Sequence, residues 1–90
     1  MKKTVITVVG KDSVGIIAKV CTYLANNNIN ILDISQTIVQ GFFNMMMIAD
    51  TNESLKDFSV IAEELEQIGQ ELSCDIKMQR EDIFDKMHRI

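Results

Sequence analysis

The chain has 90 residues, a formal net charge of −4 and 47% hydrophobic residues. This length predicts a single domain with a thin core, because so short a chain buries little more than ~60% of its unfolded surface. The acidic balance argues against binding to a phosphate backbone, and no apolar run approaches the ~18 residues of a membrane span. We therefore expect a protein that binds neither nucleic acid nor a membrane.

A strand, a glycine-containing loop and a helix open the chain. Residues 4–9 are rich in Val, Ile and Thr, which predicts a strand. We expect Gly10 to adopt backbone angles closed to other residues, Gly15 to allow close approach to the helix start, and Asp12 or Ser13 to cap that helix. The amides of the first helical turn and the positive end of its dipole would then face the loop. This arrangement is typical of a site for a small anion such as a carboxylate.

The next elements are a helix and a hairpin. Apolar residues recur at three- and four-residue spacing over residues 14–27, which predicts a helix, and the asparagines at 26–28 favour a left-handed cap that ends it. Residues 30–40 are predicted to form a strand with Ile34 and Ile38 on one face and polar residues on the other. Gln40-Gly41 predicts a tight turn, and residues 42–50 form the third strand.

The second half of the chain is predicted to repeat the strand–helix–strand order of the first half without repeating its residues. Ser54 and Asp57 match a capping box, so we expect a helix from this point to Leu72 with Leu55 on its apolar stripe. Apolar and polar residues alternate over residues 74–79, which predicts a fourth strand. Residues 82–89 are predicted to form a short C-terminal helix. The order predicts an α+β, ferredoxin-like βαββαβ sandwich: a four-stranded antiparallel sheet with two helices on one face. We expect one domain over residues 1–80, followed by the C-terminal helix within 81–90.

The third strand has apolar residues at successive positions, Met45 to Ile48. Because successive side chains of a strand point to opposite faces, this strand offers apolar groups to both faces of the sheet. One partly exposed methionine in a central strand would explain the pattern. We favour the alternative that a second subunit covers the exposed face, with the C-terminal helix contributing, and expect a homodimer or tetramer.

The remaining motifs argue against catalysis and against a metal or other cofactor. Cys21 and Cys74 lie at apolar positions far apart and are expected to be buried thiols in a reducing cytoplasm. Gly10 and Gly15 have the spacing of a P-loop, but Ile16-Ile17 stands where Lys-Ser/Thr is needed. The aromatic residues after Gly41 resemble part of an RNA-binding signature, yet the first strand has no aromatic partner. The carboxylates cluster on helix faces, where they are usually solvated.

The combination of motifs resembles the ACT domain family. The residues that carry the resemblance are the loop G-K-D-S-V-G-I at 10–16, Val20 and Leu24 in the helix, and N-I-N-I at 28–31. The element order and the length also fit, so the resemblance covers nearly the whole chain. With its predicted C-terminal helix, the chain resembles the small stand-alone ACT proteins that are similar to regulators of the glycine cleavage system. One departure is Val14, where many members have proline or arginine before the second glycine.

The resemblance implies a regulatory role, an amino-acid ligand and side-by-side dimers that share an eight-stranded sheet. One end of the ligand would meet the loop, and the other would meet Asn30 and Ile31 of the neighbouring subunit. The loop residues are Gly10, Lys11, Asp12, Ser13, Val14, Gly15 and Ile16. A partner protein would receive the signal. The alternatives are an interaction module with a vestigial loop, in which the glycines only permit tight packing, and an acylphosphatase-like hydrolase, which lacks the required arginine.

Overall fold

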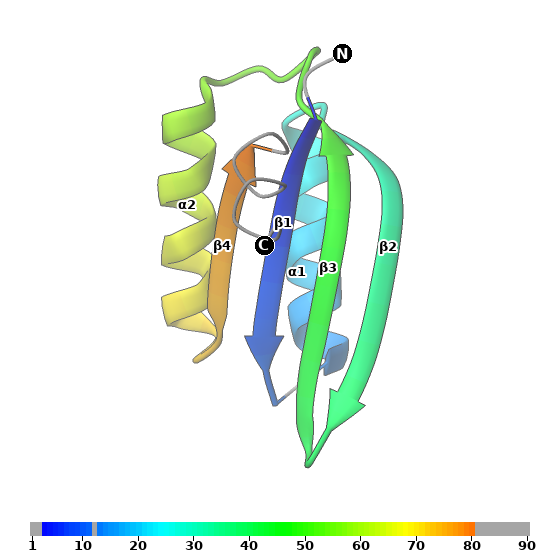
Figure 1. Ribbon diagram of the computed structural model, residues 1–90. Helices are drawn as coiled ribbons and strands as arrows, with labels where there is room; N and C mark the ends of the chain where they lie inside the picture. The colour runs from blue at the N-terminus through cyan, green and yellow to red at the C-terminus, as the bar shows by residue number, and fades with distance from the viewer. Residues whose placement is uncertain (1–2, 12, 81–90) are drawn as a thin grey trace.

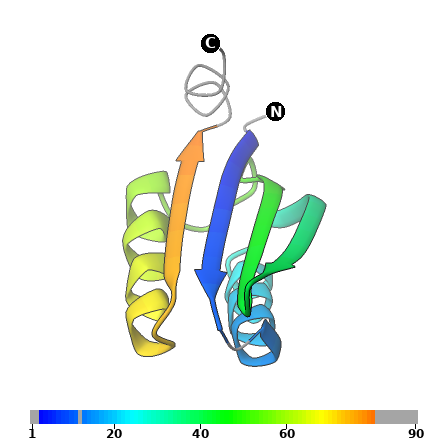
Figure 2. The same ribbon diagram turned by 60° about the horizontal axis from the view of Figure 1, so that its bottom comes forward.

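The computed structural model describes residues 3–11 and 13–80. The elements are β1 (Lys3–Gly10), α1 (Ser13–Asn26), β2 (Asn30–Val39), β3 (Phe42–Asp50), α2 (Phe58–Glu71) and β4 (Asp75–Arg80). The strands form one antiparallel sheet in the order β2-β3-β1-β4. Both helices cover the same face, α1 toward β2 and β3 and α2 toward β4 (Figure 1, Figure 2). The ferredoxin-like prediction is confirmed for these elements, whereas the expected C-terminal helix lies outside the described residues.

The core lies between the sheet and the helices. Alternate residues of the central strands β1 and β3 meet the apolar stripes of α1 and α2, as the periods of two and 3.6 residues predicted. Two turns also form as predicted. Gln40 (φ 52°) and Gly41 (φ 82°) both have positive φ, as a two-residue hairpin of this twist requires, and Asn28 (φ 60°) supplies the left-handed cap after α1. The largest fully buried apolar side chains are Ile6, Val8, Ile16, Val20, Leu24, Met47, Ile61 and Leu65.

The predicted capping box before α2 is wrong. The helix begins at Phe58, and Asp57 holds the N-cap position without a side-chain cap hydrogen bond. The Ser54 hydroxyl instead donates to the Lys56 carbonyl oxygen (2.8 Å) and accepts from the Lys56 amide (3.3 Å). A serine that bonds to nearby backbone in this way stabilises a turn and not a helix start. Leu55 therefore lies in the turn with 70% of its surface exposed, not on the buried stripe.

The expected role of Gly10 also needs correction. The residues with positive φ in the described part of the chain are Asn28, Gln40, Gly41 and Ser73, so Gly10 has a backbone conformation that other residues can adopt. What Gly10 provides is space. A Cβ there would lie 2.6 Å from Ile16 Cδ1 and 2.7 Å from Cys74 Cβ. Glycine thus allows the end of β1 to pack tightly against α1 and the start of β4. The two thiols, expected to be buried, are half-buried.

The β2 edge leaves apolar side chains exposed on both faces of the sheet. Ile34 and Ile38 point to the helix side, yet they remain 40% and 73% exposed. On the outer face, the face away from the helices, Val39, Phe42 and Met46 are exposed. The exposed apolar side chains are thus more numerous than the one partly exposed methionine that would explain the pattern of β3 without a second subunit. Because β2 is an edge strand, one side of its backbone pairs with no described strand.

Candidate functional site

The predicted ligand loop lies at the end of the sheet where β1 stops and α1 begins. Lys11 is exposed, and its Nζ lies 5.5 Å from the centroid of the Phe42 ring, within range of a cation–π contact. Val14 is exposed, whereas the Ile16 side chain is buried in the core, so only the backbone of Ile16 can face a ligand. Asp12 and the side chain of Ser13 lie outside the described part of the chain. The loop thus presents a lysine whose ammonium lies over the Phe42 ring, two residues before α1 begins at Ser13.

The structure does not bring Asn30 and Ile31 to this loop within one chain. In the sheet register, Asn30 pairs with Asp50 and Asp50 with Lys3, whereas Gly10 pairs with Phe43. The two ends of β1 are therefore ~23 Å apart at ~3.3 Å per residue. Asn30 is exposed and Ile31 packs at the margin of the core. A site that contains both the loop and Asn30 must consequently draw them from two chains.

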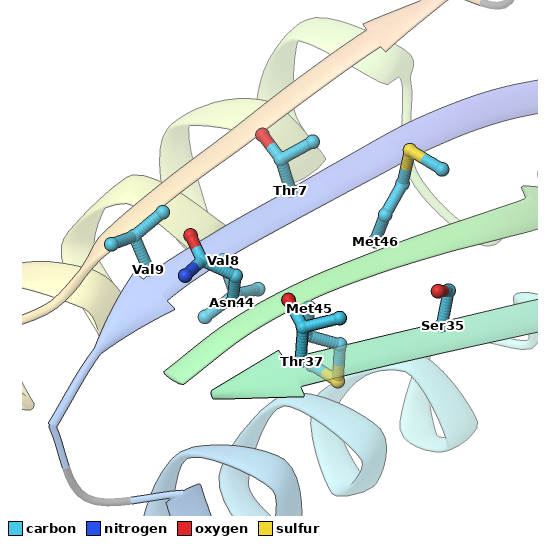
Figure 3. A pocket seen from close by; sticks show the side chains of 8 residues that line it. All are labelled: Thr7, Val8, Val9, Ser35, Thr37, Asn44, Met45 and Met46. Carbon is cyan, nitrogen blue, oxygen red and sulfur yellow. The ribbon is translucent and has the colours of Figure 1, made fainter. Parts of the chain in front are cut away.

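A shallow hollow of about 310 Å³ lies on the outer face, over β1, β3 and β2 (Figure 3). Cross-strand pairing places Met46 between Thr7 and Ser35, and Asn44 beside Thr37. The residues that line the hollow carry no charge, and its polar groups are the hydroxyls of Thr7, Ser35 and Thr37 and the amide of Asn44. Ser35 and Thr37 are among the polar residues predicted on one face of the strand over residues 30–40, but the hollow depends on three strands, so one strand's pattern could not predict it.

A second hollow, a groove of about 390 Å³, lies between α1 and α2. At its wall the Tyr23 hydroxyl donates to Glu64 Oε1 (2.5 Å), and Lys56 Nζ donates to both carboxylate oxygens of Glu64 (2.9 and 3.1 Å). Glu64 was expected to belong to a merely solvated helix face, and the structure corrects this. The chain has one tyrosine, in α1, and no local pattern of the sequence pairs it with a carboxylate 41 residues later.

The bridge shifts the protonation of both acids. Burial, together with the hydrogen bond to Glu64 and the charge of its carboxylate, raises the pKa of the Tyr23 phenol above its ordinary range. The hydrogen bond from Tyr23, followed by the one from Lys56, lowers the pKa of the Glu64 carboxyl. Both shifts have the sign expected when a neutral phenol donates to an ionised carboxylate.

Replacing Tyr23 with Phe is expected to raise the pKa of Glu64 toward its ordinary value of 4.5, because the largest lowering contact is lost. A lowered folded-state pKa contributes stability above the ordinary pKa, and this contribution disappears as the pH falls through the folded value. The variant should therefore lose less stability on acidification than the wild type. Carboxyl ¹³C NMR titration measures the pKa, with Lys56→Met as a second variant that gives a smaller rise. An unchanged Glu64 pKa in Tyr23→Phe would contradict the bridge.

No group of three or more His, Cys, Asp or Glu side chains in the described residues could hold a metal ion, and none of the helices there is long and apolar enough to cross a membrane. The candidate sites are thus the loop, the outer-face hollow and the groove between the helices.

Comparison with known proteins places the chain among domains of the same shape. The family model of the ACT domain matches residues 2–79. A UPF0237 protein of Bifidobacterium longum is 58% identical over 90 residues, the full length of both chains. The structure superimposes on an ACT domain protein from Streptococcus pneumoniae with a TM-score of 0.81 at 40% identity, covering 93% of this chain and 94% of that one. It also superimposes on a protein proposed to be a glycine cleavage system transcriptional repressor, with a TM-score of 0.73 at 25% identity, over 88% of this chain and 45% of that one.

Proposed function

The chain belongs to the ACT domain family, and we propose that it is a regulatory protein that binds an amino acid or a related metabolite as a homodimer or tetramer. The observation that carries the proposal is the loop at the start of α1. There Lys11 stands two residues before the first residue of α1, and both an ammonium group and a helix N-terminus favour a carboxylate. The bound state would be passed to a regulated partner protein in the cytoplasm, and the chain itself would catalyse no reaction.

The edge strand β2 supports assembly into dimers. If two β2 strands pair antiparallel about a two-fold axis, the sheets join into one of eight strands. That axis would pass the middle of β2, so Asn30 of the partner subunit would lie opposite Val39. Val39 adjoins the β2–β3 turn, at the same end of the sheet as Gly10. In such a dimer, Asn30 of the partner subunit would lie at the loop end of the sheet, whereas Asn30 of the same chain lies ~23 Å away at the other end.

Calorimetric titration with the twenty amino acids tests ligand binding. Saturable heat with at least one of them supports the proposal. If none of them or their close derivatives binds, the loop is vestigial and the chain is an interaction module. That second candidate is favoured by Gly10, because a packing role already explains this glycine without a ligand.

The proposed dimer can be tested through Cys21. Lys19, Tyr23 and Asn26 line the side of α1 that faces α2, so Cys21 lies on the opposite flank of α1. Since α2 covers the β4 side of the sheet (Figure 2), that opposite flank of α1 is the one toward β2. Cys21 is also near the middle of α1, level with the middle of β2, where the two-fold axis would pass. We expect a short bismaleimide to link two chains through Cys21 at micromolar protein concentration.

The two half-buried thiols provide the control for this experiment. Cys21→Ser should abolish the linked dimer on a denaturing gel, whereas Cys74→Ser should retain it, because Cys74 lies at the far side of the molecule beside β4. Light scattering on the unlinked protein gives the mass independently. A monomer at all micromolar concentrations, or a link that persists in Cys21→Ser, would refute assembly through β2.

A further inference from the structure

The groove between α1 and α2 contains polar groups that the described structure leaves unused. The two helices run antiparallel, since Tyr23 in α1 meets Glu64 in α2 and the later residue Asn27 meets the earlier residue Leu55 through a backbone hydrogen bond (3.2 Å). One end of the groove therefore holds Asn27 and the Tyr23–Glu64–Lys56 bridge, and the other holds Lys19 and Glu71. Its described lining residues are Lys19, Thr22, Tyr23, Asn26, Asn27, Lys56, Glu64, Gln67, Ile68 and Glu71.

Asn27 is a polar side chain with only 7% of its surface exposed. Its Nδ2 donates to the Tyr23 carbonyl oxygen (2.9 Å), but no described group donates to its Oδ1. No fully buried side-chain nitrogen or oxygen in the described residues lacks a hydrogen-bond partner. The Asn27 Oδ1 is therefore accessible from the groove, and it can accept a hydrogen bond from a molecule bound there.

The groove is lined by two positive and two negative side chains among the described residues. Lys56 and Glu64 neutralise each other in an ion pair. Lys19 and Glu71 make no ion pair with any described residue, although the antiparallel register places them within about one turn of each other along neighbouring helices. This end of the groove thus offers one free ammonium and one free carboxylate, and the net charge of the lining is zero.

We propose that this groove is a second binding site, for a small zwitterion that carries a further hydrogen-bond donor. Lys19 binds the carboxylate of the ligand, Glu71 binds its ammonium group, and Asn27 Oδ1 accepts the hydrogen bond from the far end of the ligand. The groove volume of about 390 Å³ lies in the range of small-molecule sites, ~300–1,000 Å³. The proposal does not depend on the loop at the start of α1, because the two sites share no described side chain.

NMR titration of the ¹⁵N-labelled protein with L-glutamine tests the proposal. L-norleucine is the matched probe, because it has the same zwitterion and a side chain of similar length without a donor. We expect glutamine to shift the amide peaks of α1 and α2 around the groove, and norleucine to bind about tenfold more weakly, as loss of one hydrogen bond to a buried acceptor implies. Lys19→Met and Glu71→Gln should each weaken glutamine binding by about tenfold or more.

The variants also separate the two sites. Lys19 and Glu71 are exposed, so their variants should keep the wild-type spectrum in the absence of ligand. Asn30→Ala removes a residue of the proposed loop site and should leave glutamine binding in the groove unchanged. The proposal is overturned if glutamine shifts no groove peaks at millimolar concentration, if Lys19→Met and Glu71→Gln bind like wild type, or if Asn30→Ala abolishes the groove shifts.

Discussion

Replacing Gly10 with Ala is expected to lower the free energy of unfolding by about 1–3 kcal/mol, the usual cost of overpacking a tight site. The added Cβ would lie 2.6 Å from Ile16 Cδ1 and 2.7 Å from Cys74 Cβ, distances that no relaxed contact permits. The Ile16 methyl group can rotate away, but Cys74 Cβ is fixed to the backbone before β4. The strand end and the Cys74 segment must therefore move apart. Urea unfolding followed by circular dichroism measures the loss.

Gly41→Ala is the matched control for this substitution. Gly41 has positive φ (82°), but nothing lies within 4 Å of its added Cβ. Its replacement therefore carries only backbone strain, about 1 kcal/mol. In the double variant Gly10→Ala with Ile16→Val, the loss of unfolding free energy should be smaller than the sum of the two single losses, because valine lacks the Cδ1 that the added Cβ would meet. Equal losses at Gly10 and Gly41, or no loss at Gly10, would show that space at Gly10 is not the reason for glycine there.

Asn30→Ala and Gly15→Val are expected to weaken ligand binding at the proposed interface site by about tenfold to a hundredfold. Asn30 is exposed at the start of β2, so its truncation should leave the fold intact. In the proposed dimer, Asn30 of the partner subunit accepts from the ligand ammonium group. Valine at position 15 would occupy the space that the ligand needs at the start of α1. Titration of each variant with the amino acid that binds wild type gives the two affinities.

Mixing the two variants distinguishes a shared site from a site within one chain. A mixed dimer would combine the intact loop of the Asn30→Ala chain with the intact Asn30 of the Gly15→Val chain. Random exchange should then restore wild-type affinity in about a quarter of the sites, because half of the dimers are mixed and each has one intact site. Recovery of no sites, with exchange verified by mass spectrometry, would show that position 15 and Asn30 act within the same chain and would refute the shared site. Equal binding by wild type and both variants would place the whole site elsewhere.

The local patterns of the sequence were sufficient for the element order. The alternation in β1 and β3, the helical spacing of Val20 and Leu24, and the Gln40-Gly41 turn all act over a few residues, so the sequence alone predicted them. Strand pairing then followed from the order of elements, because short connections and right-handed crossovers leave few arrangements. Local competition explains the failure at Ser54, whose hydroxyl can bond to a turn or to a helix start, and only the folded chain shows which it does.

The candidate sites depended on distances between residues far apart in the chain. The packing of Gly10 against Cys74, the hydrogen bond from Tyr23 to Glu64 and the hollow over three strands each join distant segments. No spacing rule predicts such contacts, because they follow from how the helices and strands stack. The sequence determined which residues form the loop and the edge strand of this protein. The tertiary structure decided that Asn30 lies at the opposite end of the sheet from the loop, because α1 returns the chain to the end where β1 began before β2 starts.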